Sequence, residues 1–241
     1  MRRRLSFAVG AAAAVVVAGL PVSAPVFGPG RSILRVDDRV LDTSSVALTF
    51  DDGPHPDGTP AALAALDRLG VKATFFLVGE QVARRPGLAA EIAARGHRIG
   101  LHTYTHRVAT WISPRAFREE LDRTAAVISE ATGRMPELFR PPRGVFTYSA
   151  LAEVRRRGLH PVLWAADGRD WRASATPLSI SGRIAGRLTG GEVVLLHDSD
   201  FYSSPGAWKS TIDALPLLLS EVRKRGLLPA PLSRRCFSGA V

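Results

Sequence analysis

Short apolar runs alternate with longer segments of helical character along nearly the whole chain of 241 residues. The first run, Val46 to Phe50, is almost continuously apolar, which is typical of a strand buried on both faces. Strands that alternate with helices favour a parallel sheet with helical crossovers. The pattern therefore predicts an α/β protein, and both a closed barrel and a doubly wound sheet are compatible with it.

Proline and glycine mark the ends of several expected helices; Thr59-Pro60, for example, opens a helix that Gly70 closes. No linker composition or fixed-period repeat divides the chain, so we expect a single domain. No G-x-G-x-x-G motif follows the first strand, which disfavours a dinucleotide-binding fold. Strands are expected at residues 46–50, 73–78, 98–101, 137–139, 161–164 and 192–196, and helices at 60–69, 86–95, 114–132, 148–157, 177–188 and 209–225.

The first 30 residues have the pattern of a targeting segment. Arg2 to Arg4 precede an apolar stretch from Leu5 to Leu20. Val22-Ser23-Ala24 resembles a cleavage site, but Pro25 disfavours cleavage there. We therefore expect residues 1–30 to be a signal peptide or an uncleaved N-terminal membrane anchor, which implies export to the cell envelope or the medium. The remaining boundaries are expected as a linker at 31–44, the main folded domain at 45–226 and a C-terminal tail at 227–241.

The chain is basic, with a formal net charge of +10 and one cysteine, Cys236. A single cysteine cannot form an intramolecular disulfide, and an exported protein without one fits a bacterial envelope enzyme. A basic surface favours anionic polymers or membrane headgroups, although an arginine-rich composition would give the same charge. No nucleic-acid-binding motif is present, and no feature sets an oligomeric state.

Polar clusters follow the expected strands directly. In a parallel α/β fold the carboxyl ends of the strands share one face, where functional sites are built. Segments far apart in the sequence are therefore expected to converge there. The clusters are Asp51-Asp52, His102 with His106, Arg140 to Gly144, Asp167 with Asp170 and Trp171, and His197-Asp198.

His102 and His106 are spaced so that a helical turn would place both on one face, where they would hold a divalent ion. A carboxylate would complete a three-ligand site with open positions. Asp51 and Asp52 would repel each other unless one were neutralised, so a metal on one would leave the other free as a base. His197 ends an apolar strand and is either a structural residue or a general acid oriented by Asp170 or Asp198.

These five clusters, in this order, resemble the motifs of the polysaccharide deacetylase family with a NodB-type domain (carbohydrate esterase family 4). The resemblance runs from about Ser45 to Arg225. It implies a distorted, incomplete (β/α) barrel with parallel strands. It also implies a metal-dependent hydrolase that removes N-acetyl groups from a polymer such as peptidoglycan or chitin and releases acetate.

The resemblance also implies a role for each site residue. Asp52, His102 and His106 would bind the metal, commonly zinc. Asp51 would be the base and His197 the acid, with Arg140 and Asp170 as their charged partners; Trp171 and Leu195 would line the pocket for the acetyl methyl group, and the Arg143 N–H would donate to the oxyanion.

The chain departs from the family pattern at Arg143, where a tyrosine is usual. The backbone donor survives this replacement, whereas the contact of the ring with sugar is lost, and Arg143 is free to meet a carboxylate or phosphate of the substrate. Three other functions remain open. They are an O-acetyl esterase acting on xylan or cell-wall sugars, a non-catalytic glycan-binding wall protein, and a deformylase or deacylase of a lipid-linked sugar.

Overall fold

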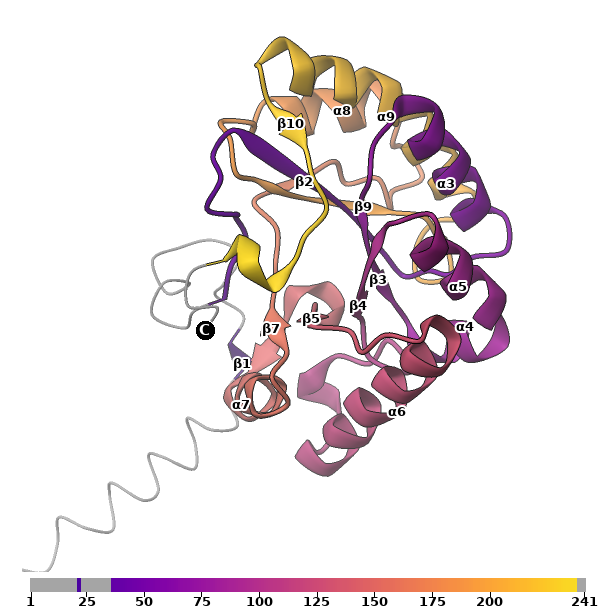
Figure 1. Ribbon diagram of the computed structural model, residues 1–241, viewed down its shortest axis with the longest axis vertical. Helices are drawn as coiled ribbons and strands as arrows, with labels where there is room; N and C mark the ends of the chain where they lie inside the picture. The colour runs from indigo at the N-terminus through magenta and orange to yellow at the C-terminus, as the bar shows by residue number, and fades with distance from the viewer. Residues whose placement is uncertain (1–20, 23–35, 238–241) are drawn as a thin grey trace, which may run out of the picture.

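The computed structural model describes residues 21–22 and 36–237 of the chain, and its main feature is a curled, parallel sheet (Figure 1). The strands run in the order β7-β5-β4-β3-β2-β9-β8, and β10 pairs with β2. The strand path is open between β7 and β8, which confirms the expected incomplete barrel. The strands are β2 (Ser45–Asp51), β3 (Thr74–Leu77), β4 (Arg98–Leu101), β5 (Leu138–Phe139), β7 (His160–Pro161), β8 (Ala166–Asp167), β9 (Val193–His197) and β10 (Leu228–Pro229).

Strand β2 lies inside the sheet between β3 and β9, and all of its residues are buried. Its largely apolar sequence predicts this burial. It pairs in parallel with β3 on one side and β9 on the other, which sets Asp51 opposite His197. Phe50 stacks on Phe75 of β3 with their ring centroids 5.1 Å apart. These contacts fix the carboxyl end of β2 at the centre of the barrel mouth.

Helices connect the strands and cover the outside of the curled sheet (Figure 1). In the described part of the chain they are α3 (Gly58–Leu69), α4 (Gly79–Arg84), α5 (Pro86–Ala94), α6 (Pro114–Thr132), α7 (Tyr148–Arg156), α8 (Pro177–Ala185) and α9 (Ala207–Lys224). Helix α6 begins at Pro114 with the Ser113 hydroxyl accepting a hydrogen bond from the Ala116 N–H, and it ends at Gly133 with φ 68°. Both ends match the sequence signals.

Several local expectations were incomplete. The strand expected at 161–164 is the shorter β7, and β8 follows it, so Asp167 ends a strand of its own. Helix α4 was not expected; its six residues are too few to show a helical period. Residues 102–106 form a loop and not a helical turn.

The described parts of the expected linker and C-terminal tail, residues 36–44 and 227–237, pack against the sheet. Val36 and Val40 are buried, and Arg39 pairs with the buried Glu192. In the C-terminal segment, Leu232 is fully buried and Phe237 stacks on His160. Both flanking segments therefore cover apolar surface of the sheet within the described residues.

The targeting segment expected at 1–30 lies outside the described residues except for β1 (Pro21–Val22), which pairs with β6 (Phe146–Thr147). None of the helices in the described ranges is both long and apolar enough to cross a bilayer. Cys236, the single cysteine, is half-buried and free.

Candidate active site

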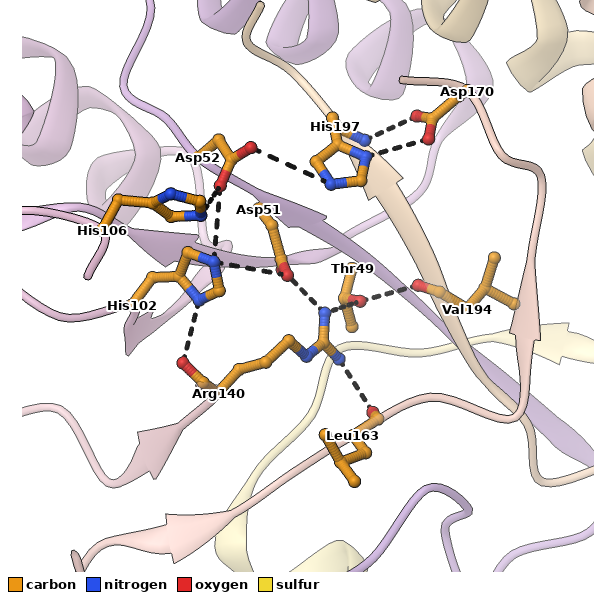
Figure 2. Close-up of polar contacts among 10 residues, drawn as sticks. All are labelled: Thr49, Asp51, Asp52, His102, His106, Arg140, Leu163, Asp170, Val194 and His197. Carbon is orange, nitrogen blue, oxygen red and sulfur yellow. Dashed lines mark hydrogen bonds and ion pairs between the residues drawn. The ribbon is translucent and has the colours of Figure 1, made fainter. Parts of the chain in front are cut away.

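The carboxyl ends of β2, β4, β5, β8 and β9 bring the predicted site residues together (Figure 2). Asp51 and Asp52 come from β2, His102 from β4, Arg140 from β5 and His197 from β9. Asp170 reaches the same place from the loop after β8. The sequence clusters thus converge as the parallel topology predicts.

Asp51 and Asp52 are neighbours, yet both carboxylates line the same pocket. Successive residues of a strand point to opposite faces of a sheet. Asp52 breaks this alternation because its φ is 76°, a left-handed conformation that aspartate adopts more readily than most residues. The chain therefore turns at the end of β2 and presents two acids to one cavity.

Asp52, His102 and His106 form a three-residue cluster with ligand atoms within 4.8 Å of one another. Asp52 Oδ1 lies 3.1 Å from His106 Nε2 and 3.3 Å from His102 Nε2. The same buried oxygen has no partner with hydrogen-bond geometry. Burial opposes ionisation of Asp52, but the two imidazoles outweigh it and hold its pKa well below the usual range. An ionised carboxylate that converges with two ring nitrogens fits a divalent cation.

His102 is oriented by the backbone. Its Nδ1 lies 2.9 Å from the Arg140 carbonyl oxygen, which can only accept a hydrogen bond. The proton therefore sits on Nδ1 and leaves a lone pair on Nε2, the atom that faces Asp52. Metal-binding histidines are commonly fixed in this way.

The loop that carries both histidines is tied to helix α6 by Glu120. This buried carboxylate accepts hydrogen bonds of 2.7 Å from the backbone N–H groups of Tyr104 and Thr105, and one from the Thr105 hydroxyl. Thr103 and His106 have φ values of 61° and 57°. The histidines converge through these left-handed residues, which corrects the helical turn expected for their spacing.

Asp51 faces a different partner. Its Oδ1 accepts a 2.7 Å hydrogen bond from Arg140, whose side chain is fully buried. Arg140 also donates to the Thr49 hydroxyl and the Leu163 carbonyl, and its guanidinium lies 4.1 Å from the Phe76 ring centroid. These contacts fix Arg140 and, through it, the carboxylate of Asp51.

His197 pairs with Asp170. Its Nδ1 lies 2.9 Å from Asp170 Oδ1, and its backbone N–H donates to the other oxygen. The Thr211 hydroxyl donates to the same carboxylate. Burial disfavours the charged imidazolium, yet the negative charge of Asp170 and, to a smaller extent, the charges of Asp52 and Asp51 raise the pKa of His197 to about 10. His197 is thus held as a proton donor whose Nε2 points toward Asp52 (Figure 2).

The pocket over these groups has a volume of about 380 Å³. Trp171 stands edge-on to the His197 ring, with their centroids 5.6 Å apart. Leu195 and Trp171 supply apolar lining, and Arg143 also lines the pocket, as expected from the sequence. Its remaining lining residues are Asp51, Asp52, His102, His106, Trp164, His197, Tyr202 and Ser203.

Sequence reasoning missed Tyr202 and Glu120. The Tyr202 ring stacks on His106 at 3.9 Å between centroids, and its hydroxyl donates to Glu80. No local pattern marks Tyr202, because the contact joins two loops far apart in sequence. Glu120 did leave a signal: it lies on the apolar stripe of α6 beside Phe117 and Leu121, where an acid is unusual.

The fold is an open α/β barrel. Its site combines a cluster suited to a divalent cation with an acid, His197, and a base, Asp51, each held by a charged partner. These features define a class of metal-dependent hydrolase. The polysaccharide deacetylase model matches residues 38–162, and the chain belongs to that family.

Known proteins agree with this assignment. The chain is 36% identical to a chitooligosaccharide deacetylase of Bradyrhizobium sp. (strain ANU 289), over 86% of this chain and 97% of that protein. It resembles the solved structure of the Bc1960 peptidoglycan N-acetylglucosamine deacetylase, with a TM-score of 0.74, 31% identity and coverage of 79% and 86% of the two chains. It also resembles the structure of a family 4 carbohydrate esterase from Streptomyces lividans in complex with acetate. The TM-score is 0.70 and the identity is 32%, and the match covers 78% of this chain and 93% of that chain.

Proposed function

We propose that the protein is a zinc-dependent enzyme that removes N-acetyl groups from N-acetylglucosamine in a cell-wall polysaccharide and releases acetate. The observation that carries this proposal is the division of the acid pair. Asp52 converges with two histidines, whereas Asp51 bonds to Arg140 and lies 3.9 Å from His102 Nε2, beyond hydrogen-bond distance. The names of the relatives, which act on chitooligosaccharide and peptidoglycan, support the substrate class.

An amide resists hydrolysis because water is a weak nucleophile and an amine a poor leaving group. A zinc ion held by Asp52, His102 and His106 would polarise the acetyl carbonyl and lower the pKa of a water ligand to about 7. Asp51, held by Arg140, accepts the proton of the attacking water. His197, held protonated by Asp170, gives its proton to the departing nitrogen.

The pocket supplies the rest of the site. The backbone N–H of Arg143 is proposed to donate to the developing oxyanion, and one such donor typically contributes about 3–4 kcal/mol. Trp171 and Leu195 are proposed to receive the acetyl methyl group, since both line the pocket beside His197. Acid–base assistance by Asp51 and His197 is expected to add about 10²–10⁴-fold in rate.

The test is acetate release from N-acetylated peptidoglycan, chitooligosaccharides and acetylxylan, measured side by side with and without a chelator. We expect release from an N-acetylated glycan that a chelator abolishes and zinc restores. Sugar affinity without acetate release under any divalent metal would instead support a non-catalytic glycan-binding protein.

O-acetyl ester hydrolysis at the same site is the second candidate. A structural relative is named a carbohydrate esterase, and an ester leaving group needs less protonation than an amine. His197→Ala is therefore expected to lose amide hydrolysis while retaining part of any ester hydrolysis. Equal losses on both substrates would contradict His197 as the acid for the leaving group.

We further propose that the protein works outside the cytoplasm, secreted or attached to the envelope through residues 1–30. The basic start and the following apolar stretch support export. Fractionation of cells that express the full chain, with N-terminal sequencing of the exported form, distinguishes cleavage after Ala24 from anchoring. Recovery of the protein solely from the cytoplasm would contradict export.

A further inference from the structure

An exposed aromatic residue contacts an arginine that lines the pocket. Trp111 belongs to the short helix η2 (Ala109–Trp111), which follows the metal-binding loop, and its side chain is 69% exposed. The Arg143 guanidinium carbon lies 5.6 Å from the centroid of the Trp111 ring. A large exposed aromatic beside a pocket offers a flat face to a ligand.

The backbone under Arg143 is firmly held. Pro142 and Gly144 on either side of it are buried, and Arg143 itself has φ 58° in the short helix η3 (Pro142–Gly144). The side chain is exposed, yet it lines the pocket that contains Asp51 and His197. The backbone of Arg143 is therefore set by a turn with buried neighbours, and its guanidinium contacts the Trp111 ring.

Arg143 forms no ion pair with a carboxylate among the described residues, and its guanidinium contacts the Trp111 ring instead. Arg107, directly after His106, and Arg169, directly before Asp170, are also exposed and without an ion pair in the described part of the chain. Arg143 on the pocket, and Arg107 and Arg169 next to site residues in the sequence, are thus exposed cations that form no ion pair among the described residues. A guanidinium that lines a pocket without a carboxylate partner can pair with a carboxylate of a ligand, and nearby positive charge favours an anionic ligand.

We propose that Trp111 and Arg143 form a subsite for a sugar that carries a carboxylate and neighbours the acetylated sugar in the polymer. The ring face of that sugar stacks on Trp111 while its carboxylate pairs with Arg143. This subsite makes the enzyme prefer an acidic glycan to a neutral one. The inference rests on the proposed deacetylation and names its substrate class.

The experiment compares three N-acetylated glycans of equal length. They are a neutral chitooligosaccharide, a peptidoglycan glycan strand with free carboxyl groups, and the same strand with its carboxyl groups converted to amides. Values of kcat/KM for acetate release are measured at low and at physiological ionic strength. We expect the wild type to prefer the free-acid strand over both others, and salt to weaken this preference.

Arg143→Gln is expected to lower the ratio of kcat/KM for the acid strand to that for the amidated strand about fivefold, the scale of a partly exposed ion pair. Arg143→Lys is expected to retain part of the ratio. Trp111→Ala is expected to raise KM for all three glycans. Arg68→Gln, which removes an exposed charge at the C-terminal end of α3, is the matched control and leaves the ratio unchanged.

The outcomes separate the two proposals. If the wild type releases no acetate from any of the glycans, the proposed function fails. If acetate is released but the ratio is the same in wild type, Arg143→Gln and Arg68→Gln, the deacetylase stands and the acidic subsite is overturned. A ratio that falls equally in Arg68→Gln assigns the preference to net charge and also overturns the subsite.

Discussion

At the scale of single residues, the environment of each acid and histidine decides its chemistry. Asp51 and Asp52 have the same side chain and adjacent positions, but one meets a buried guanidinium and the other two imidazoles. His197 differs from His102 in the same way, because a carboxylate rather than a carbonyl holds its Nδ1. Arg140 as the partner of Asp51 and Asp170 as the partner of His197 were expected from the family resemblance, whereas the carbonyl on His102 was not. No spacing rule alone divides an Asp-Asp pair.

Asp51→Asn is expected to reduce kcat by about 10²–10⁴-fold, because the amide cannot accept the proton of the attacking water. It is expected to leave zinc affinity within a few-fold of the wild type, since Asp51 lies outside the three-residue cluster. Isothermal titration with zinc and acetate-release kinetics measure the two effects separately. Asp213→Asn, an exposed residue of α9, is the control. An active Asp51→Asn enzyme would show that Asp51 is not the base.

Asp170→Asn is expected to shift the alkaline limb of the pH dependence of kcat/KM to lower pH. Asp170 contributes most to raising the pKa of His197 from 6.5 to about 10. Because this folded-state pKa is raised, the stabilisation by the imidazolium is complete below about pH 6.5 and is lost as the pH rises through about 10. Without the charge of Asp170, His197 therefore loses its proton at a lower pH. An alkaline limb that does not move in Asp170→Asn would contradict this account.

At the scale of elements, helix α6 and the loop after β4 act as one unit. The loop holds two candidate metal ligands, and Glu120 of the helix accepts hydrogen bonds from two backbone N–H groups of the loop. The ends of α6 and the strand β4 were predictable because caps and apolar runs are local signals. The shape of the loop was not, since left-handed residues and a distant carboxylate produce it.

Glu120→Ala is expected to weaken zinc affinity by up to about 10–100-fold, the range seen when a group that orients metal ligands is lost, because Glu120 holds the loop between His102 and His106. The variant leaves two backbone N–H groups without their acceptor and frees the loop between His102 and His106. Competition with a fluorescent zinc chelator measures the change. Glu119→Ala, the exposed neighbour on the same helix, is the control and is expected to bind zinc as the wild type does. Equal affinities in both variants would remove Glu120 from the metal site.

At the scale of the whole molecule, the barrel is covered in part by the segments on either side of the residues that match the family motifs. The alternation of strands and helices predicted the parallel sheet, because burial on both faces leaves a direct mark on sequence. The packing of residues 36–44 and 227–237 was not predictable in the same way. Their apolar residues are isolated, and only the finished sheet offers them a surface.

Leu232→Ala is expected to lower the free energy of unfolding by about 2–5 kcal/mol, the usual cost of truncating a buried leucine. Leu232 is fully buried in the cluster that contains Phe76 and Val193. Urea denaturation followed by circular dichroism measures the loss. Leu228→Ala, at a side chain 66% exposed, is expected to cost far less. Similar stabilities for the two variants would show that residues 227–237 behave as a tail.

Across the described residues, every non-glycine residue with positive φ lies in a loop that builds the site: Asp52, Thr103, His106, Arg143 and Arg169. Each such conformation costs on the order of 1 kcal/mol, which the surrounding packing must offset. Grafting the side chains of this site onto another barrel would therefore fail without the loops themselves. A designer who wishes to transplant the chemistry must copy the backbone first and the residues second.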